Sequence, residues 1–283
     1  SFQYCLSITF SNVLIDSRCL GYCYAKEVKV SNSPPPLAHF IYQMATQTDD
    51  SFLRRFNRVF TSLDDKLEKP VVEHLRAVYT TLALGLTVAA FGAAAHLYTD
   101  VLRAGFILSI ASFGLMFSLL STPATLENEK KRFGLFCGFC FTTGISLGPL
   151  LEFAIYVNPQ IIISALLFTV VIFGAFSLAS LHAENTKYLY LGGTLMSASF
   201  SLLFLSLFAR WMLPSFLFIA AGLAISCGFV LYDTQLIVEK NRRGDHDYTW
   251  HAVELFIDFI QIFRYVVVLL LDKEERNNRR RRD

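Results

Sequence analysis

The stretch Glu254-Leu-Phe-Ile-Asp-Phe-Ile-Gln-Ile-Phe-Arg264 decides how this chain folds. It is apolar at most positions, yet it carries Asp258, Gln261 and Arg264 within a few helical turns. Such a segment is hydrophobic enough to enter a membrane but too polar to face lipid on every side. We therefore expect the span at residues 253–271 to lie in the middle of a helical bundle, or to enter and leave the membrane on one side.

The rest of the chain is typical of an integral membrane protein. Of 283 residues, 54% are hydrophobic, 17% are charged and 27 are Phe, and a soluble domain rarely carries so many apolar residues in such long blocks. Crossing a hydrocarbon core of about 30 Å takes about 20 apolar residues in a helix. We predict an all-α integral membrane protein that forms a seven-helix bundle, with six clear spans and the polar seventh. The six clear spans are 78–98, 104–121, 133–157, 161–181, 188–208 and 214–238.

The two ends of the chain differ from this apolar body. No methionine precedes Met44, and residues 1–43 lack the charged start, apolar centre and cleavage site of a signal peptide. We interpret 1–43 as a non-native or variable extension and 44–75 as a cytoplasmic N-terminal segment. The bundle then covers 76–271, and 272–283 form a basic tail.

Basic residues indicate the orientation of the bundle, because Lys and Arg in short loops are retained on the cytoplasmic side. They gather before the first span, in the second loop at 130–132 and in the sixth loop at 240–243. These connections alternate, so we predict a cytoplasmic N-terminus. The basic tail conflicts with seven full crossings, so either the last span is re-entrant or the tail is an exception. It is a topology anchor or binds anionic lipid headgroups.

Asp233 and Asp258 are the leading candidates for a functional site, since each lies within an apolar run. An ionisable group at membrane depth costs about 2.5 to 3.5 kcal/mol on insertion scales and usually handles ions or protons, or has a partner. Asp233 lies near the end of its apolar run, so an alternative interpretation is that its carboxylate reaches interfacial water. Two carboxylates that meet in a low dielectric share a proton and titrate as one unit. Loss of that proton would favour a transiently bound calcium ion, which prefers hard oxygen ligands.

Further polar residues are candidate accessory groups. Glu254 lies one helical turn before Asp258, and two ionised acids at that spacing repel, so Glu254 needs a shared proton, a cation or a basic partner, unless interfacial water solvates it. Gln261 continues the same face. Glu152 follows Pro149 in the third span, either near the far interface or as a cavity-lining acid. His251, next to Trp250, is expected at the membrane boundary.

The cysteines and glycines of the third span have structural interpretations. Cys137 and Cys140 have neither a second Cys pair nor a nearby His, so we interpret them as small core residues and expect no structural metal and no required disulfide. Two small-residue repeats, Gly134-x-x-x-Gly138 and Gly144-x-x-x-Gly148, are typical of a groove that lets another helix approach closely.

No enzyme is indicated. Gly144-Ile-Ser-Leu-Gly148 has the Gly-x-Ser-x-Gly spacing, but it lies inside an apolar span and not at a strand-to-helix turn. The chain has no His-Glu-x-x-His motif, and the aspartate pair alone permits only the idea of an intramembrane acid protease. An ion leak and a non-conducting adaptor for other membrane proteins both fit the sequence. We expect no cofactor and no nucleic-acid partner.

Several uncommon motifs in the same order carry a family resemblance over residues 74–271. They are Gly144-Ile-Ser-Leu-Gly-Pro-Leu-Leu-Glu-Phe153, Tyr190-Leu-Gly-Gly-Thr-Leu-Met-Ser197, Gly228-Phe-Val-Leu-Tyr-Asp-Thr-Gln-Leu-Ile237, Gly244-Asp-His-Asp-Tyr-Thr-Trp-His251 and Leu255-Phe-Ile-Asp-Phe-Ile-Gln-Ile-Phe-Arg264. With these the chain resembles the eukaryotic endoplasmic reticulum type of the transmembrane Bax inhibitor motif family.

The resemblance implies a pH-sensitive calcium leak in the endoplasmic reticulum membrane that suppresses programmed cell death and stress signalling. It implies that Asp233 and Asp258 form the pH sensor and ion pathway. The implied partners are calcium ions, protons, membrane lipids, and death-regulator and stress-sensor membrane proteins. Bacterial relatives add an arginine latch on the second helix; no single residue here aligns with it, and the basic cluster that ends at Arg132 is the nearest candidate.

Overall fold

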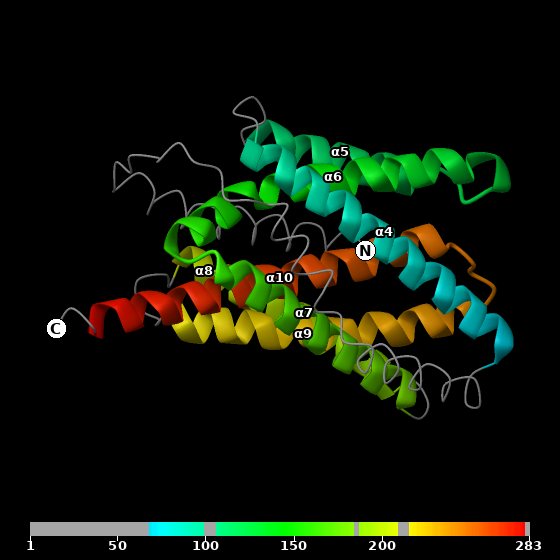
Figure 1. The fold of residues 1–283 in the computed structure, drawn as a ribbon. Coiled ribbons are helices and arrows are strands. Elements are labelled where there is room, and N and C mark those ends of the chain that lie inside the picture. The colour runs from blue at the N-terminus through cyan, green and yellow to red at the C-terminus, as the bar shows by residue number, and fades with distance from the viewer. Residues whose placement is uncertain (1–67, 99–105, 184–186, 209–214, 281–283) are drawn as a thin grey trace, which may run out of the picture.

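The computed structural model describes residues 68–98, 106–183, 187–208 and 215–280. These residues form seven α-helices and two short 3-10 turns, and no strand occurs among them (Figure 1). The helices are α4 (Lys69–Tyr98), α5 (Phe106–Ser121), α6 (Glu129–Val157), α7 (Gln160–His182), α8 (Leu191–Phe208), α9 (Ser215–Arg242) and α10 (Tyr248–Arg280); η1 (Leu126–Asn128) precedes α6, and η2 (Lys187–Tyr190) precedes α8. The expectation for residues 1–43 and the first part of 44–75 lies outside the described residues.

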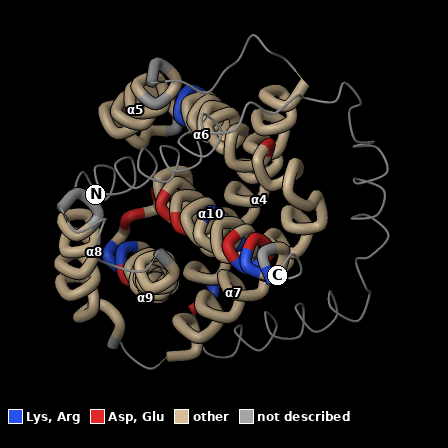
Figure 2. The backbone as a smooth tube through the Cα atoms, turned by 90° about the vertical axis from the view of Figure 1, so that its left-hand side faces the viewer, with Lys and Arg blue, Asp and Glu red and all other residues tan. Residues whose placement is uncertain are grey.

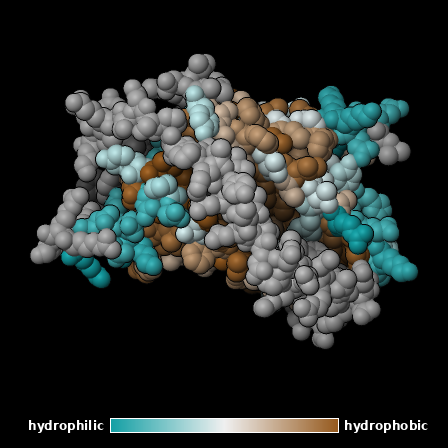
Figure 3. All heavy atoms as spheres, viewed as in Figure 1, coloured by the Kyte–Doolittle hydropathy of each residue, from teal (hydrophilic) through white to brown (hydrophobic). Residues whose placement is uncertain are grey.

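The prediction of an all-α membrane bundle is confirmed. Five of the described helices are long and apolar enough to cross a membrane, α5 is a shorter apolar helix, and α10 carries the polar residues noted above. Apolar residues cover the middle of the molecule, and polar residues gather towards its two ends (Figure 3). Helices are expected here, because lipid offers backbone N–H and C=O groups no hydrogen-bond partners. α4 begins at Lys69, within the predicted N-terminal segment, and α10 continues into the predicted tail.

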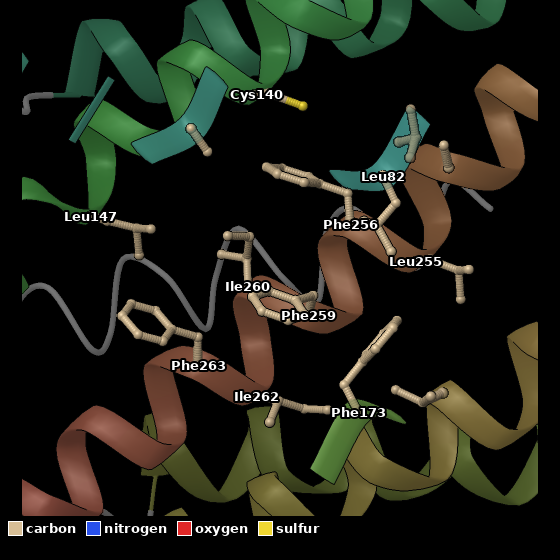
Figure 4. Packing of buried hydrophobic residues seen from close by; sticks show 14 of the residues in the cluster. Leu82, Cys140, Leu147, Phe173, Leu255, Phe256, Phe259, Ile260, Ile262 and Phe263 are labelled. Atoms are coloured by element: carbon tan, nitrogen blue, oxygen red, sulfur yellow. The ribbon is translucent and has the colours of Figure 1, made fainter. Parts of the chain in front are cut away.

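Helix α10 is the centre of the bundle, which is one of the two arrangements expected for the polar span. It contacts α4, α6, α7 and α9 and runs as one continuous helix between them (Figure 2). Phe256 packs edge-on against Phe136 and Phe139 of α6, with ring centroids 6.1 and 5.8 Å away. Phe259 packs against Phe173 of α7 at 5.4 Å (Figure 4). These buried rings join α10 to two opposing helices and fix its rotation.

The second glycine repeat of α6 brings α6 and α4 into close contact. A Cβ atom at Gly144 would overlap the carbonyl group of Ala89, and one at Gly148 would overlap the ring of His96. Gly134 of the first repeat faces open space, while a Cβ atom at Gly138 would make an ordinary contact with Leu115 of α5. α6 continues through Pro149 to Val157.

The turn between α9 and α10 is specified by local sequence. Gly244 has a φ of +93°, which suits glycine because other L-residues rarely adopt it. The amides of Gly244 and Asp245 donate to the carbonyls of Asn241 and Lys240 at 3.0 Å, as in a Schellman motif. Asp247 then caps α10, since its Oδ1 accepts a hydrogen bond from the Trp250 amide at 3.1 Å. This turn makes α9 and α10 an antiparallel pair.

Candidate functional site

Asp233 of α9 and Asp258 of α10 meet inside the bundle. They are 2% and 3% exposed, and a side-chain hydrogen bond joins their carboxyl groups. A carboxylate has no proton to donate, so a hydrogen bond between two carboxyl groups forms only when one of them is protonated. The other oxygen of Asp258, Oδ2, has no hydrogen-bond partner among the described residues. The two acids that the sequence singled out are therefore brought together, away from water.

Contacts with α7 hold the segment around Asp233 in place. Ser180 of α7 donates to the carbonyl of Leu231 at 2.7 Å, and Gln235 donates to the carbonyl of Ser180 at 3.4 Å. The side-chain oxygen of Gln235 accepts a bond from the Tyr188 amide at 2.8 Å. These bonds lie on either side of Asp233 along α9, so they fix the helix that presents it.

Glu254 has a basic partner, which is one of the alternatives that its spacing from Asp258 left open. The ammonium group of Lys240 on α9 donates to both carboxylate oxygens of Glu254, at 3.1 and 3.2 Å. The indole N–H of Trp250 also donates to Glu254 at 2.9 Å. The Glu254 side chain is 14% exposed, so this carboxylate is held by protein groups rather than by open solvent.

Arg132 lies at the end of the bundle that contains the α9–α10 turn, called here the hairpin end and defined by residues 243–247 and their contacts. Its guanidinium pairs with the carboxylate of Asp247. It also donates to the carbonyl of Leu119, at 3.4 Å, and to that of Thr122, near the end of α5. Arg132 therefore joins α5, α6 and the α9–α10 turn, and its acidic partner is Asp247 rather than the aspartate pair.

A histidine pair also lies at the hairpin end. Nε2 of His74 on α4 is 2.9 Å from Nδ1 of His251 on α10, and His251 is fully buried. His251 therefore lies at the hairpin end of the bundle, where its ring packs inside against α4.

The remaining candidates separate into a buried and an exposed residue. Gln261 is 8% exposed and lies on the same face of α10 as Asp258. Glu152 is exposed on α6. No group of three His, Cys, Asp or Glu side chains suitable for a metal ion occurs among the described residues.

Sequence reasoning identified the acids but missed their neighbours. Lys240 was assigned only to a basic loop, whereas it binds Glu254; His74 and Asp247 were not singled out. The Lys240 contact had a weak signal, because a tight turn at Gly244 predicts that α9 and α10 run antiparallel. The contact between His74 and His251 joins residues 177 positions apart and had no local signal.

The geometry defines a class of protein: a multi-pass helical membrane protein with a hydrogen-bonded carboxyl pair on two adjacent central helices.

Comparisons with known proteins identify the family. Residues 71–275 match the family described as "Inhibitor of apoptosis-promoting Bax1". The chain is 46% identical over 203 residues to Bax inhibitor 1 of Homo sapiens, which covers 70% of this chain and 84% of that protein. It is 39% identical over 219 residues to Bax inhibitor 1 of Drosophila melanogaster (76% and 89%), and 35% identical over 208 residues to that of Oryza sativa subsp. japonica (72% and 82%). The chain belongs to the Bax inhibitor family.

Proposed function

We propose that this protein is a pH-sensitive calcium leak of the endoplasmic reticulum membrane that suppresses programmed cell death and stress signalling. The observation that carries the proposal is the buried, hydrogen-bonded pair of Asp233 and Asp258 between two central helices. A purely structural role would be better served by apolar residues, because burying acids at membrane depth is costly. The calcium ion is the transported species, and the proposal includes no catalytic step.

The shared proton supplies the pH sensitivity. While the pair holds one proton, the two carboxyl groups attract each other and keep α9 and α10 together. Loss of that proton leaves two negative charges in contact, which a calcium ion with its preference for carboxylate oxygens would stabilise. Gain of a second proton removes the charge-assisted bond and loosens the closed arrangement. We therefore expect acidification of the cytoplasmic side to increase the leak.

The first test is calcium entry into liposomes that contain the purified full-length protein, between about pH 5 and pH 8, the range in which shifted carboxyl pairs titrate. Asp258→Asn and Asp233→Asn keep the side-chain shape but remove the titrating group, so each should abolish the pH dependence of the flux. Asp272→Asn is a matched control on α10, because Asp272 is partly exposed and pairs with Arg276 outside the buried site.

Each outcome of the flux experiment has a definite meaning. A parental flux with a pH dependence that survives in Asp272→Asn and disappears in both site variants supports the leak. A site variant that titrates like the parent removes the pair as the sensor. A folded, inserted protein without flux above empty liposomes favours the alternative function, a non-conducting adaptor that regulates apoptosis through other membrane proteins.

The cellular part of the proposal comes from the relatives, which are named Bax inhibitor 1. Death-regulator and stress-sensor membrane proteins are the proposed partners, and the basic residues of the C-terminal tail are proposed to contact lipid headgroups. The basic loops at 130–132 and 240–243 lie at one end of the bundle with the start of α4, which supports a cytoplasmic N-terminus. Expression in cells that lack the family protein, scored for survival after reticulum stress, tests this part.

A further inference from the structure

The acidic face of α10 is not limited to the aspartate pair. Glu254 lies one helical turn before Asp258, and its charge acts on Asp258 together with that of Asp233. Asp258 thus lies within electrostatic reach of two further acids, one on each of the helices α9 and α10. The charged neighbours of Asp258 that contribute to this interaction are themselves acids. An arrangement of this kind needs a positive charge close by.

Lys240 supplies that positive charge. Its ammonium group contacts both oxygens of Glu254, which is the arrangement that a metal cation would also adopt at a carboxylate. Lys240 is two helical turns from Asp233 on α9, on the hairpin-end side of the pair. Its side chain is 26% exposed, so the flexible stem connects a buried contact with the surface of the bundle.

We propose that Lys240 acts as a tethered cation that competes with calcium for Glu254 at the hairpin end of the aspartate pair. When its ammonium group holds both Glu254 oxygens, that carboxylate offers no ligand to an ion. When the side chain swings into water, Glu254 becomes available and the acidic face extends from the hairpin end to Asp258. This inference rests on the proposed calcium leak and adds a residue that sets its calcium dependence.

Trp250 keeps the Glu254 carboxylate in place while Lys240 and calcium compete for it. Its indole N–H holds Glu254 at 2.9 Å independently of Lys240, so the carboxylate keeps its position when the ammonium group leaves. The Schellman turn at Gly244 fixes the register of α9 against α10, and therefore keeps Lys240 opposite Glu254. Lysine is suited to this role because its point charge makes and breaks contacts more freely than the planar fork of arginine.

The test measures calcium flux into liposomes as a function of calcium concentration for the full-length parent and for four variants. Lys240→Gln should lower the half-saturating calcium concentration by about tenfold, the factor that corresponds to about 1.4 kcal/mol of lost competition. Lys240→Arg keeps the charge and binds both oxygens as a fork, so its half-saturating concentration should equal or exceed that of the parent. The double variant Lys240→Gln with Glu254→Gln should lose the gain of the single variant.

Arg243→Gln is the matched control for the loss of one positive charge at the same end. Arg243 is exposed and pairs with Glu239, outside the acidic face, so its half-saturating concentration should stay at the parental value. A fall in Arg243→Gln equal to that in Lys240→Gln would overturn the proposal in favour of a general surface-charge effect. A structural lesion would lower the maximal flux and would not lower the calcium requirement.

The outcomes separate this inference from the proposed function. One combination of results would support the leak and refute the tethered cation. In that combination the parent conducts, Asp258→Asn removes the pH dependence, and Lys240→Gln needs at least as much calcium as the parent. A lower calcium requirement in Lys240→Arg would overturn it too, because this variant retains the positive charge at Glu254. If the folded parent shows no flux, the leak itself fails and the competing role of Lys240 fails with it.

Discussion

At the scale of single residues, the most consequential contact outside the acidic face is the one between Arg132 and Asp247. Asp247 caps α10 with one carboxylate oxygen and binds Arg132 with the other. Arg132 in turn satisfies two carbonyl groups near the end of α5. Arg132→Ala should therefore cost about 3 kcal/mol, the low end for breaking a buried ion pair, because Asp247 is 18% exposed.

The measurement is the midpoint of thermal unfolding in detergent micelles. Arg276→Ala is the control, since Arg276 forms an exposed ion pair one turn from Asp272 and should contribute about 0.5 kcal/mol or less. Equal small shifts in both variants would show that the Arg132 contact does not stabilise the fold.

The same residues show which features of the site can be predicted from the sequence and which cannot. Asp233 and Asp258 were predictable because a charge inside an apolar run is unusual whatever the fold. The partners of Arg132 and Lys240 were not, because an ion pair depends on which helices become neighbours. Glu254 lies between these cases: its spacing from Asp258 required a partner, and only the antiparallel hairpin identified that partner as Lys240.

At the scale of elements, the close approach of α4 and α6 depends on one of the two glycine repeats. The sequence assigned the same role to both, since the spacing of small residues is the same. Side-chain surroundings distinguish them: Gly144 lies against the backbone of Ala89, whereas Gly134 faces open space. The repeat pattern predicts that a helix can approach but not where the partner helix crosses.

Substitution by alanine tests this difference. Gly144→Ala should destabilise the bundle by about 1–3 kcal/mol, the usual cost of overpacking, because the backbone of α4 cannot move aside as a flexible side chain would. Gly134→Ala has room and gains up to about 1 kcal/mol of helix propensity, so it should be neutral or stabilising. Thermal unfolding of both variants in the same detergent compares them, and a loss in Gly134→Ala equal to that in Gly144→Ala would refute the assignment.

At the scale of the whole molecule, the path of α10 determines the topology. The sequence left two possibilities for its last span, because the polar residues argued against lipid exposure and the basic tail argued against a full crossing. Burial in the bundle removes the first difficulty, since α10 packs against α4, α6, α7 and α9. α10 has 33 residues, about 50 Å at 1.5 Å per residue, which exceeds the hydrocarbon thickness of about 30 Å. Its C-terminal end lies at the opposite end of the molecule from the α9–α10 turn (Figure 1).

A full crossing predicts that the two ends of α10 are accessible from opposite sides of the membrane, even though the positive charge of the tail favours the same side as the basic loops. In a variant without the six native cysteines, single cysteines replace Arg243, Glu127 or Asn278, all of which are exposed. On sealed membrane vesicles, an impermeant maleimide should label Arg243→Cys and Glu127→Cys alike, because both lie at the hairpin end. On the same sealed vesicles the maleimide should not label Asn278→Cys, which should become reactive only when detergent opens the vesicles. Labelling of all three from one side would mean that α10 returns to the side from which it entered. The tail would then obey the charge rule, and the continuous central helix would not be the arrangement in the membrane.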